Sequence, residues 1–256
     1  MWERVVERIV NFIKETVKSA NANGVVVGIS GGVDSATTAF LCVRALGKEK
    51  VLGLIMPERG VTREEDIEDA LNVCKILGIS YKYVEINPMV DAFLKNLEDG
   101  TDIAKANLKP RIRMIINYFY ANSLNYLVAG TGNKSELMTG YFTKYGDGGV
   151  DFLPIGDLYK TEVWELARFL GVPKRIIEKK PSAGLWIGQT DEGELGITYV
   201  KLDTILKALE KGYRPEEIPK VFDVSEEEVR RVLEMVEKSK HKRELPPIAN
   251  VRDLIG

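Results

Sequence analysis

The sequence predicts an α/β protein with a doubly wound, mostly parallel sheet flanked by helices. Short runs of valine, isoleucine and leucine recur along the first half of the chain, and segments with helical periodicity separate them. Continuous apolar runs are typical of parallel strands buried on both faces, and their alternation with helices favours right-handed crossovers. The 256 residues, 45% of them hydrophobic, are enough for a full core.

The predicted elements follow in chain order. The first 20 residues indicate an amphipathic helix, whose apolar face holds Trp2, Val5, Val6, Ile9, Ile13 and Val17. We expect strands at 25–29, 51–56, 81–86 and 126–130. We expect helices at 34–46, 62–78, 88–97, 101–122, 160–170 and 203–211.

Local signals indicate where several helices begin and end. Thr62 with Glu65 has the spacing of a capping box, and so does Ser225 with Glu228. Gly78 is a stop signal, and Pro110 suits the first turn of a helix. The segment 180–196 has turn formers and acids without periodicity, and a loop of that length is typical of a lid.

The composition argues against several classes of function. Lys and Arg number 36 against 38 Asp and Glu, and the net charge of −2 disfavours nucleic acid as the main partner. We expect no membrane segment, because no run of about 18 apolar residues is present and the charged first helix is unlike a signal peptide. Cys42 and Cys74 suit core positions in a cytoplasmic protein, and a single histidine argues against zinc. No linker divides the chain, so residues 1–256 are expected to form one domain.

A glycine pair between the first strand and its helix carries the clearest chemical signal. In the string Ser30-Gly31-Gly32-Val33-Asp34-Ser35, the glycines let the backbone approach an anion, and the helix start offers unpaired N–H groups. The string is neither a Walker loop nor a dinucleotide fingerprint, because the lysine and the glycine spacing of those motifs are missing. Asp34 beside phosphates makes sense if a divalent cation lies between them. The alternative is that Asp34 only complements the helix dipole and the glycines only form the turn.

Two further clusters hold charged residues. Residues 107–114, NLKPRIRM, place three cations in an apolar helical context, for which a solvated basic face is the alternative. Residues 129–163 follow the fourth strand, and doubly wound sheets bind ligands at the carboxyl ends of their strands. The polar candidates in this glycine-rich segment are Thr131, Glu136, Lys144, Asp147, Asp151 and Lys160. Each alone suits an ordinary surface, but a surface loop has no need of so many glycines and charges together.

The loop SGGVDS resembles the pyrophosphate loop of the ATP pyrophosphatase superfamily, whose members split ATP into AMP and pyrophosphate. Together with FTKYGDGG at 142–149 and HKR at 241–243, it resembles the ammonia-dependent NAD synthetases over nearly the whole chain. The resemblance implies a Rossmann-like fold of the adenine nucleotide alpha hydrolase type. It also implies the amidation of deamido-NAD to NAD with ATP, Mg²⁺ and ammonia, by a homodimer that binds the dinucleotide at its interface.

The resemblance also assigns a role to each matching residue. Mg²⁺ would be bound by Asp34 and Glu136, and the catalytic residues would be Asp147 and Lys160. ATP would be bound by Gly28, Ile29, Ser30, Gly31, Gly32, Val33, Asp34, Ser35, Thr131, Lys160 and Ser182, the last of which replaces a threonine of many relatives. Deamido-NAD would be bound by Arg111, Lys144, Asp151, His241 and Lys242.

The implied chemistry meets a physical need, because an anionic carboxylate repels nucleophiles and its oxygen is a poor leaving group. Attack of the nicotinate carboxylate on the α-phosphorus of ATP would form an acyl adenylate, and ammonia would then displace AMP. Lys160 would neutralise charge on the phosphates, and Asp147 would bind ammonium and take its proton. The tail around His241 would fold back onto the substrate.

Three alternative functions have different requirements. A glutamine-hydrolysing synthetase needs an amidase domain, and the chain begins only about 23 residues before the first strand, so ammonia is expected to be free or supplied by a partner. A tRNA-thiolating enzyme would carry cysteine pairs and a basic surface. A nucleotide-binding sensor would not need Asp34 and Glu136 together.

Overall fold

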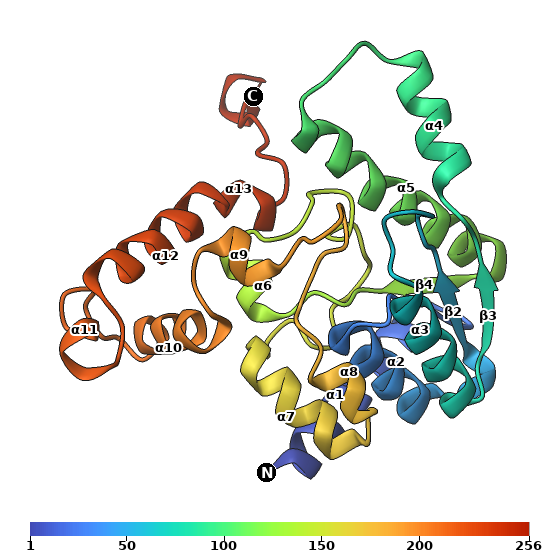
Figure 1. Cartoon of the computed structure of the whole chain (residues 1–256), viewed down its shortest axis with the longest axis horizontal. Coiled ribbons are helices and arrows are strands. Elements are labelled where there is room, and N and C mark those ends of the chain that lie inside the picture. The colour runs from blue at the N-terminus through green and yellow to red at the C-terminus, as the bar shows by residue number, and fades with distance from the viewer. Residues whose placement is uncertain (256) are drawn as a thin grey trace.

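A computed structural model describes residues 1–255 of the chain (Figure 1). Its first half comprises α1 (Trp2–Ser19), β1 (Gly24–Gly28), α2 (Val33–Leu46), η1 (Lys48–Lys50), β2 (Val51–Ile55), α3 (Glu64–Leu77), β3 (Ser80–Tyr83), α4 (Asn87–Asn96), α5 (Asp102–Leu124) and β4 (Tyr126–Ala129). Its second half comprises α6 (Lys134–Thr139), α7 (Lys160–Leu170), α8 (Lys174–Ile177), α9 (Asp191–Leu195), α10 (Tyr199–Glu210), α11 (Ile218–Val221), α12 (Glu226–Lys238), α13 (Lys240–Arg243) and α14 (Arg252–Ile255).

The sheet is parallel, and its strand order is β3-β2-β1-β4. Val25 of β1 pairs with Val51 on one side and with Leu127 on the other. The chain passes from β1 to β2 and β3 in one direction, then returns past β1 to β4. The predicted doubly wound fold is therefore confirmed, and its topological switch point lies between β1 and β4, where such sheets bind ligands.

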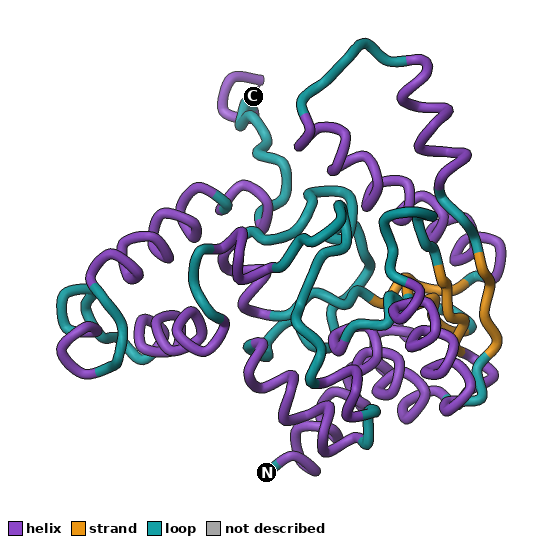
Figure 2. The backbone as a smooth tube through the Cα atoms, in the orientation of Figure 1, coloured by secondary structure: helices purple, strands orange, loops and turns teal. Residues whose placement is uncertain are grey.

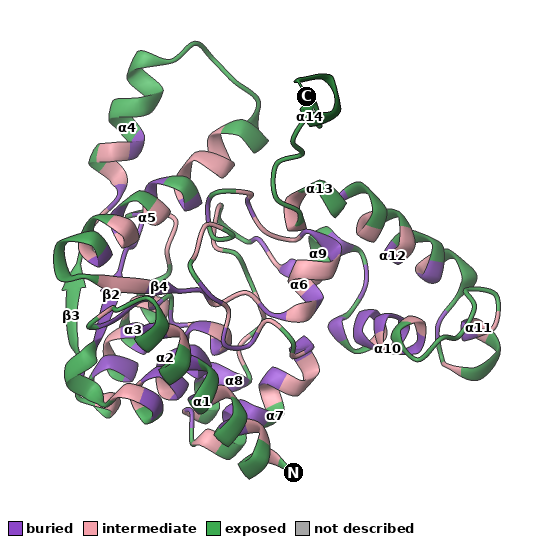
Figure 3. Cartoon of the chain, turned by 180° about the vertical axis from the view of Figure 1, so that it is seen from behind, coloured by how far each residue is buried: buried purple, intermediate pink, exposed green. Residues whose placement is uncertain are grey.

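Both faces of β1 and β2 are buried, as their apolar runs predict, whereas the edge strand β3 is exposed. Val25 and Val27 pack into a cluster with α1, α2, α3 and α7, whereas Val26 packs with α4 and α5. Neighbouring side chains along a strand point to opposite faces, so one short run of valines serves both clusters. Buried residues accordingly occur in helices on both sides of the sheet (Figure 3). Cys42 and Cys74 are free and buried, as expected for core residues.

A third apolar cluster is formed mainly by α10 and α12. Trp164 of α7 packs against this cluster and also against the first one. Loops, together with the short helices α6 and α9, lie between the sheet and α10 to α12 (Figure 2). Among residues 1–255, no helix combines the length and the apolar character that a membrane crossing requires.

The start of α3 differs from the predicted one. The capping box expected from Thr62 and Glu65 is wrong, because Thr62 Oγ1 accepts a hydrogen bond from Glu58 N at 2.9 Å and closes the preceding turn. Arg63 is the N-cap residue instead. The predicted stop is confirmed, since Gly78 ends α3 in the left-handed conformation.

The place of Pro110 in α5 differs from the expected one, whereas the starts of α5 and α12 agree with the sequence. Pro110 was expected in a first turn but lies inside α5. Thr101 is the stronger start signal, because its Oγ1 accepts a hydrogen bond from Ala104 N at 3.2 Å and caps the helix earlier. The capping box of Ser225 and Glu228 is present at α12.

The segment expected to be a loop over 180–196 is shorter than predicted. Residues 191–195 form α9, which Thr190 caps by accepting a hydrogen bond from Gly193 N at 3.3 Å. The loop therefore covers residues 178–190. Likewise α10 begins at Tyr199 rather than at residue 203, because Thr198 caps it.

Candidate active site

The phosphate loop, residues 30–35, connects β1 to α2 at the switch point. Gly31 has φ +79°, a left-handed conformation that favours glycine. Ser30 Oγ and Ser35 Oγ lie 3.0 Å apart, and Gly32 N donates to Ser30 Oγ at 3.2 Å. Gly32 is the N-cap residue of α2, and no side chain within residues 1–255 caps this helix. The N–H groups of its first turn are therefore available to an anion.

The residues beside the loop fix its backbone. Gly28 ends β1, and Ile29 N donates to Leu54 O of β2 at 2.8 Å. Val33 is buried in the first turn of α2. Ile29 and Val33 pack their side chains into the core, and Gly28 has no side chain. Any contact they make with ATP would therefore use the backbone.

Lys160 reaches Asp34 from far along the chain. It is the first residue of α7 and is 2% exposed. Its Nζ lies 2.5 Å from Asp34 Oδ2, 3.8 Å from Glu136 Oε1 and 5.2 Å from the ring centroid of Tyr199. Burial lowers the pKa of Lys160, but Asp34 and Glu136 raise it by more, so the lysine stays protonated. The structure thus brings three predicted site residues together.

The surroundings of Glu136 disfavour its charged form. Burial and repulsion from Asp34 raise its pKa to about 8, against the attraction of Lys160. With both acids ionised, the cluster carries more negative than positive charge. A cation between the two carboxylates would remove their repulsion, so the arrangement favours cation binding with loss of a proton.

Asp34 and Glu136 fit Mg²⁺ by their chemistry, because this ion prefers oxygen ligands. Within the described residues 1–255, no three His, Cys, Asp or Glu side chains are arranged as a ready metal cage. An ion held by these two carboxylates would need further oxygen atoms. Phosphates and water supply those atoms in most magnesium sites that bind nucleotides.

Asn133 is a site residue that the sequence reasoning missed. It is fully buried, and its Nδ2 donates to Asp34 Oδ1 at 3.0 Å. It also forms the capping box of α6, in which Asn133 Oδ1 accepts from Glu136 N and Glu136 Oε2 accepts from Asn133 N. One amide therefore orients both carboxylates. The N-K-S-E spacing of a capping box was the signal that could have indicated it.

Asp203 is a second missed residue, and it fixes the start of α7. Its Oδ2 accepts from Thr161 N at 2.8 Å, and its Oδ1 accepts from Ser135 Oγ at 2.5 Å. Ser135 Oγ in turn accepts from Lys160 N at 2.9 Å. Asp203 is 1% exposed and lies on α10, so the C-terminal helices position Lys160. Nothing in the local sequence indicates this contact.

The C-terminal tail lies against the loop that follows α6. Lys242 Nζ donates to the carbonyl oxygens of Gly140 and Phe142 at 2.6 and 2.7 Å. Lys144 Nζ donates to His241 O at 2.5 Å. The tail therefore folds back, as expected, onto the segment that holds a second predicted group of substrate residues. Its contact with substrate stays a prediction.

The three cations of NLKPRIRM point to different partners. Arg111 Nη2 donates to Lys144 O at 3.3 Å, which brings Arg111 to the same segment. Lys109 Nζ lies 2.7 Å from Glu58 Oε2, and Arg113 Nε donates at 3.0 Å to the carbonyl that follows β2. Only Arg111 therefore joins the group around Lys144. The reading of all three as one solvated basic face is wrong, because Lys109 and Arg113 are held by partners within the fold.

Asp147 and Asp151 already take part in the local structure. Asp147 Oδ1 accepts from Thr143 N at 2.8 Å and closes the turn between them. Asp151 Oδ2 accepts from Val128 N at 2.7 Å, and its Oδ1 accepts from the Tyr118 hydroxyl at 3.0 Å. Asp151 thus holds its segment to β4. Its predicted contact with substrate, and the contact of Asp147 with ammonia, stay predictions.

Thr131 and Ser182 are placed differently from each other. Thr131 follows β4 at the switch point and is partly buried. Ser182 is exposed in the loop 178–190, where its Oγ accepts from Gly184 N at 3.1 Å. The residue of this loop that reaches the phosphate loop is Lys179, whose Nζ donates to Gly31 O at 3.2 Å. Lys179 was also missed.

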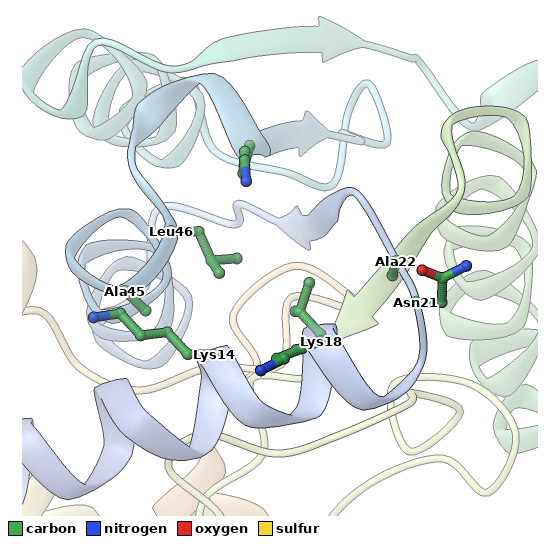
Figure 4. A pocket seen from close by; sticks show the side chains of 8 residues that line it. Lys14, Lys18, Asn21, Ala22, Ala45 and Leu46 are labelled. Carbon is green, nitrogen blue, oxygen red and sulfur yellow. The ribbon is translucent and has the colours of Figure 1, made fainter.

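A surface groove of about 390 Å³ lies between α1, the end of α2 and η1 (Figure 4). Lys14, Lys18 and Lys50 are among the residues that line it. These elements meet where β1 and β2 begin, which is the edge of the sheet opposite the switch point. Doubly wound sheets bind their ligands at the carboxyl edge, so we place the active site at the phosphate loop.

Known relatives agree with the class that the fold and the phosphate loop define, an ATP-cleaving α/β enzyme. The model of the NAD synthase family matches residues 5–246, and the chain belongs to that family. The NH3-dependent NAD(+) synthetase of Archaeoglobus fulgidus is 65% identical over 254 residues, which cover 99% of each chain. That of Methanocaldococcus jannaschii is 54% identical over 97% of each chain. The resemblance stated from the motifs is confirmed.

Solved structures give the same fold. The NH3-dependent NAD synthetase from Campylobacter jejuni superposes with a TM-score of 0.84 at 38% identity, over 98% of this chain and 99% of that one. The NMN synthetase from Francisella tularensis superposes with a TM-score of 0.87 at 37% identity, over the same shares of the two chains. The two names differ in the nucleotide that is synthesised.

Proposed function

We propose that the phosphate loop, Asp34, Glu136 and Lys160 bind and cleave ATP while deamido-NAD is amidated to NAD. Membership of the NAD synthase family makes the chain a ligase that forms a C–N bond with ammonia (EC 6.3.1.5). The observation that carries the assignment of residues is their convergence: Lys160 Nζ lies 2.5 Å from Asp34 and 3.8 Å from Glu136, beside the uncapped start of α2.

The first step forms a mixed anhydride. The nicotinate carboxylate attacks the α-phosphorus of ATP, the bond to pyrophosphate breaks, and an acyl adenylate remains. Negative charge develops on the leaving pyrophosphate, and we assign Lys160 and the N–H groups at the start of α2 to stabilise it. Mg²⁺ bound by Asp34 and Glu136 would supply further charge neutralisation and would orient the phosphates.

The second step forms the amide. Ammonia attacks the acyl carbon, the C–N bond forms, and the C–O bond to AMP breaks. Ammonium must lose a proton before this attack, and Asp147 is the carboxylate that we assign to bind it and accept the proton. Because Thr143 N already bonds Asp147 Oδ1, we assign this role to Oδ2.

Deamido-NAD is assigned to the residues around Lys144. Arg111 and Lys242 lie with Lys144 on one part of the surface, since Arg111 bonds Lys144 O and Lys242 bonds the carbonyls of residues 140 and 142. Cationic groups pair well with a dinucleotide pyrophosphate. Asp151 and His241 are the assigned partners of ribose hydroxyls; His241 contacts Lys144 through its carbonyl oxygen, whereas Asp151 bonds to Tyr118 and Val128.

A homodimer is supported by an apolar stripe on α5. Ile115 and Phe119 are 54% and 65% exposed and lie one turn apart on the helix. Arg111 lies one turn before Ile115 on the same face, so a partner that covers the stripe would approach the substrate residues. Two-fold contact through α5 would therefore place both copies of the site at the interface.

Two further inferences concern the whole chain. We infer that residues 1–256 fold as one domain, because Trp164 packs against the sheet cluster and against the C-terminal cluster. We also infer a cytoplasmic reaction, which the two free, buried cysteines support, since disulfides are rare in that compartment.

The test is an assay of product identity. The protein is incubated with ATP, Mg²⁺ and ammonium, and either deamido-NAD or nicotinic acid mononucleotide, and NAD, NMN and pyrophosphate are measured. We expect NAD and pyrophosphate in equal amounts from the dinucleotide. The mononucleotide is included because of the likeness to the NMN synthetase. A higher kcat/KM for the mononucleotide than for deamido-NAD would show that the mononucleotide is the substrate.

A further inference from the structure

Lys179 contacts the phosphate loop from the side that faces α3. Its Nζ donates to Gly31 O at 3.2 Å, to Asp66 Oδ1 at 2.7 Å and to Asp69 Oδ2. The side chains of Lys179, Asp66 and Asp69 are only 12%, 19% and 4% exposed. An ammonium group has three N–H donors, so these contacts use all of them.

The two carboxylates are themselves held in place. Asp66 and Asp69 lie one turn apart on α3. Arg63 Nε donates to Asp66 Oδ2 at 2.9 Å, and Arg175 Nε lies 2.8 Å from Asp69 Oδ1. Lys179, Arg63 and Arg175 carry three positive charges against the two negative charges of Asp66 and Asp69, so the carboxylates fix the position of Lys179 Nζ without cancelling its charge. Lys179 acts on the loop through the direction of its bond to Gly31 O.

The backbone of α3 also presses against the loop. A Cβ atom added to Gly31 would lie 2.2 Å from Asp66 O, so only glycine fits there. The chain continues with Gly32, and two consecutive glycines leave the peptide between them free to rotate. Packing alone therefore does not fix which way this peptide points.

The peptide between Gly31 and Gly32 has two ends that matter. A trans peptide is planar, so the C=O of Gly31 and the N–H of Gly32 point in opposite directions. Lys179 binds the C=O on the side of the loop that faces α3. The N–H on the other side donates to Ser30 Oγ at 3.2 Å, a long bond that a phosphate oxygen can replace. If this peptide turned over, a carbonyl oxygen would face the phosphates and repel them.

We propose that Lys179 is a positioning residue that holds the Gly31–Gly32 peptide with its N–H directed toward the phosphates of ATP and of departing pyrophosphate. The inference rests on the proposed function, because it requires the phosphate loop to bind polyphosphate. The three N–H donors of Lys179 Nζ are used by Gly31, Asp66 and Asp69, so we assign Lys179 no contact with substrate. It acts by keeping one backbone donor in place.

The test compares Lys179→Met with Lys180→Met, which removes the neighbouring exposed lysine. Initial rates of NAD formation give KM for ATP, KM for deamido-NAD and the inhibition constant of pyrophosphate. Loss of one hydrogen bond to a charged ligand corresponds to about a 10- to 100-fold loss of affinity. In Lys179→Met, KM for ATP and the inhibition constant of pyrophosphate should both rise by about that factor, whereas KM for deamido-NAD should change less than about twofold.

Two further variants separate positioning from folding. Lys179→Arg keeps a cationic donor and should fall between the wild type and Lys179→Met in pyrophosphate affinity. If Lys179→Met does not fold, the double variant Asp69→Asn, Lys179→Met removes a buried charge together with its partner and is measured instead. A folded variant with unchanged affinity for ATP and pyrophosphate would overturn the inference. Failure of the wild type to form NAD would instead overturn the proposed function.

Discussion

Replacing Asp34 with asparagine tests both the stability and the chemistry of the site. The substitution keeps the shape of the side chain and removes its charge. Asn133 Nδ2 donates to Asp34 Oδ1 in the wild type, so the new amide would keep its oxygen toward Asn133 and turn its NH₂ toward Lys160. Two donors would then face each other where an ion pair of 2.5 Å now stands.

The expected loss of stability follows from the partners that remain. Breaking a buried ion pair from one side costs about 3–5 kcal/mol when the other charge has no other partner. Lys160 retains Glu136 at 3.8 Å, and loss of the repulsion from Asp34 favours ionisation of Glu136. We therefore expect about 2–3 kcal/mol, close to the value of a hydrogen bond between charged groups. For a chain of this size that is a fall in melting temperature of about 4–12 °C.

The assay combines thermal unfolding with NAD formation coupled to alcohol dehydrogenase. Asp34→Asn should fold and should lose at least about 1000-fold in kcat, since metal and charge stabilisation of the transition state is worth several kcal/mol. Asp157→Asn is the control, because Asp157 is 96% exposed in its ion pair with Lys134 and should change stability by less than about 0.5 kcal/mol. An Asp34→Asn variant as stable as this control, with turnover that still depends on Mg²⁺, would refute the reasoning.

Three other perturbations address other parts of the site. Burial and Asp34 raise the pKa of Glu136, so Mg²⁺ binding near pH 7 should release protons and should strengthen as the pH rises to about 8. Calorimetry measures this proton release as a binding heat that changes with the ionisation enthalpy of the buffer. Equal binding heats in different buffers would contradict the prediction. Asp203→Ala leaves the buried hydroxyl of Ser135 and the partly buried N–H of Thr161 without this acceptor and should cost about 1–3 kcal/mol, with a lower kcat and an unchanged KM for deamido-NAD. An unchanged kcat would show that Asp203 does not position Lys160. Phe119→Asp places a charge in the exposed stripe of α5 and should give monomers by analytical ultracentrifugation, whereas a stable dimer would exclude that interface.

The sequence was sufficient for features that depend on neighbouring residues. The valine run of β1, the glycine pair at 31 and 32 and the start of α2 form one continuous segment, so strand, turn and anion site could be predicted together. The burial of β1 and β2 on both faces also followed, because a continuous apolar run needs two covered faces. Lys160 was among the charged candidates that follow the fourth strand, but its role on ATP came only from the resemblance of the motifs to a family.

Contacts between distant segments could not be predicted in the same way. Asn133 lies 99 residues from Asp34, and Lys179 lies 148 residues from Gly31. No periodicity or spacing relates such pairs, because they depend on how helices dock on the sheet. Thr62 closes the turn before α3, whereas Thr101 caps the start of α5. A threonine that closes a turn cannot be told apart in sequence from one that starts a helix.

The separation of 126 residues between Asp34 and Lys160 has a consequence during protein synthesis. A chain still growing on the ribosome can pair all four strands before residue 160 emerges, and it then presents Asp34 and Glu136 without their cation. Lys160 reaches them only when α7 docks, and α7 is itself held by Asp203 of α10. If Lys160 acts on the phosphates as proposed, the ability to split ATP arises only after most of the chain has been made, and a fragment that ends before α7 would hold the phosphate loop without cleaving ATP.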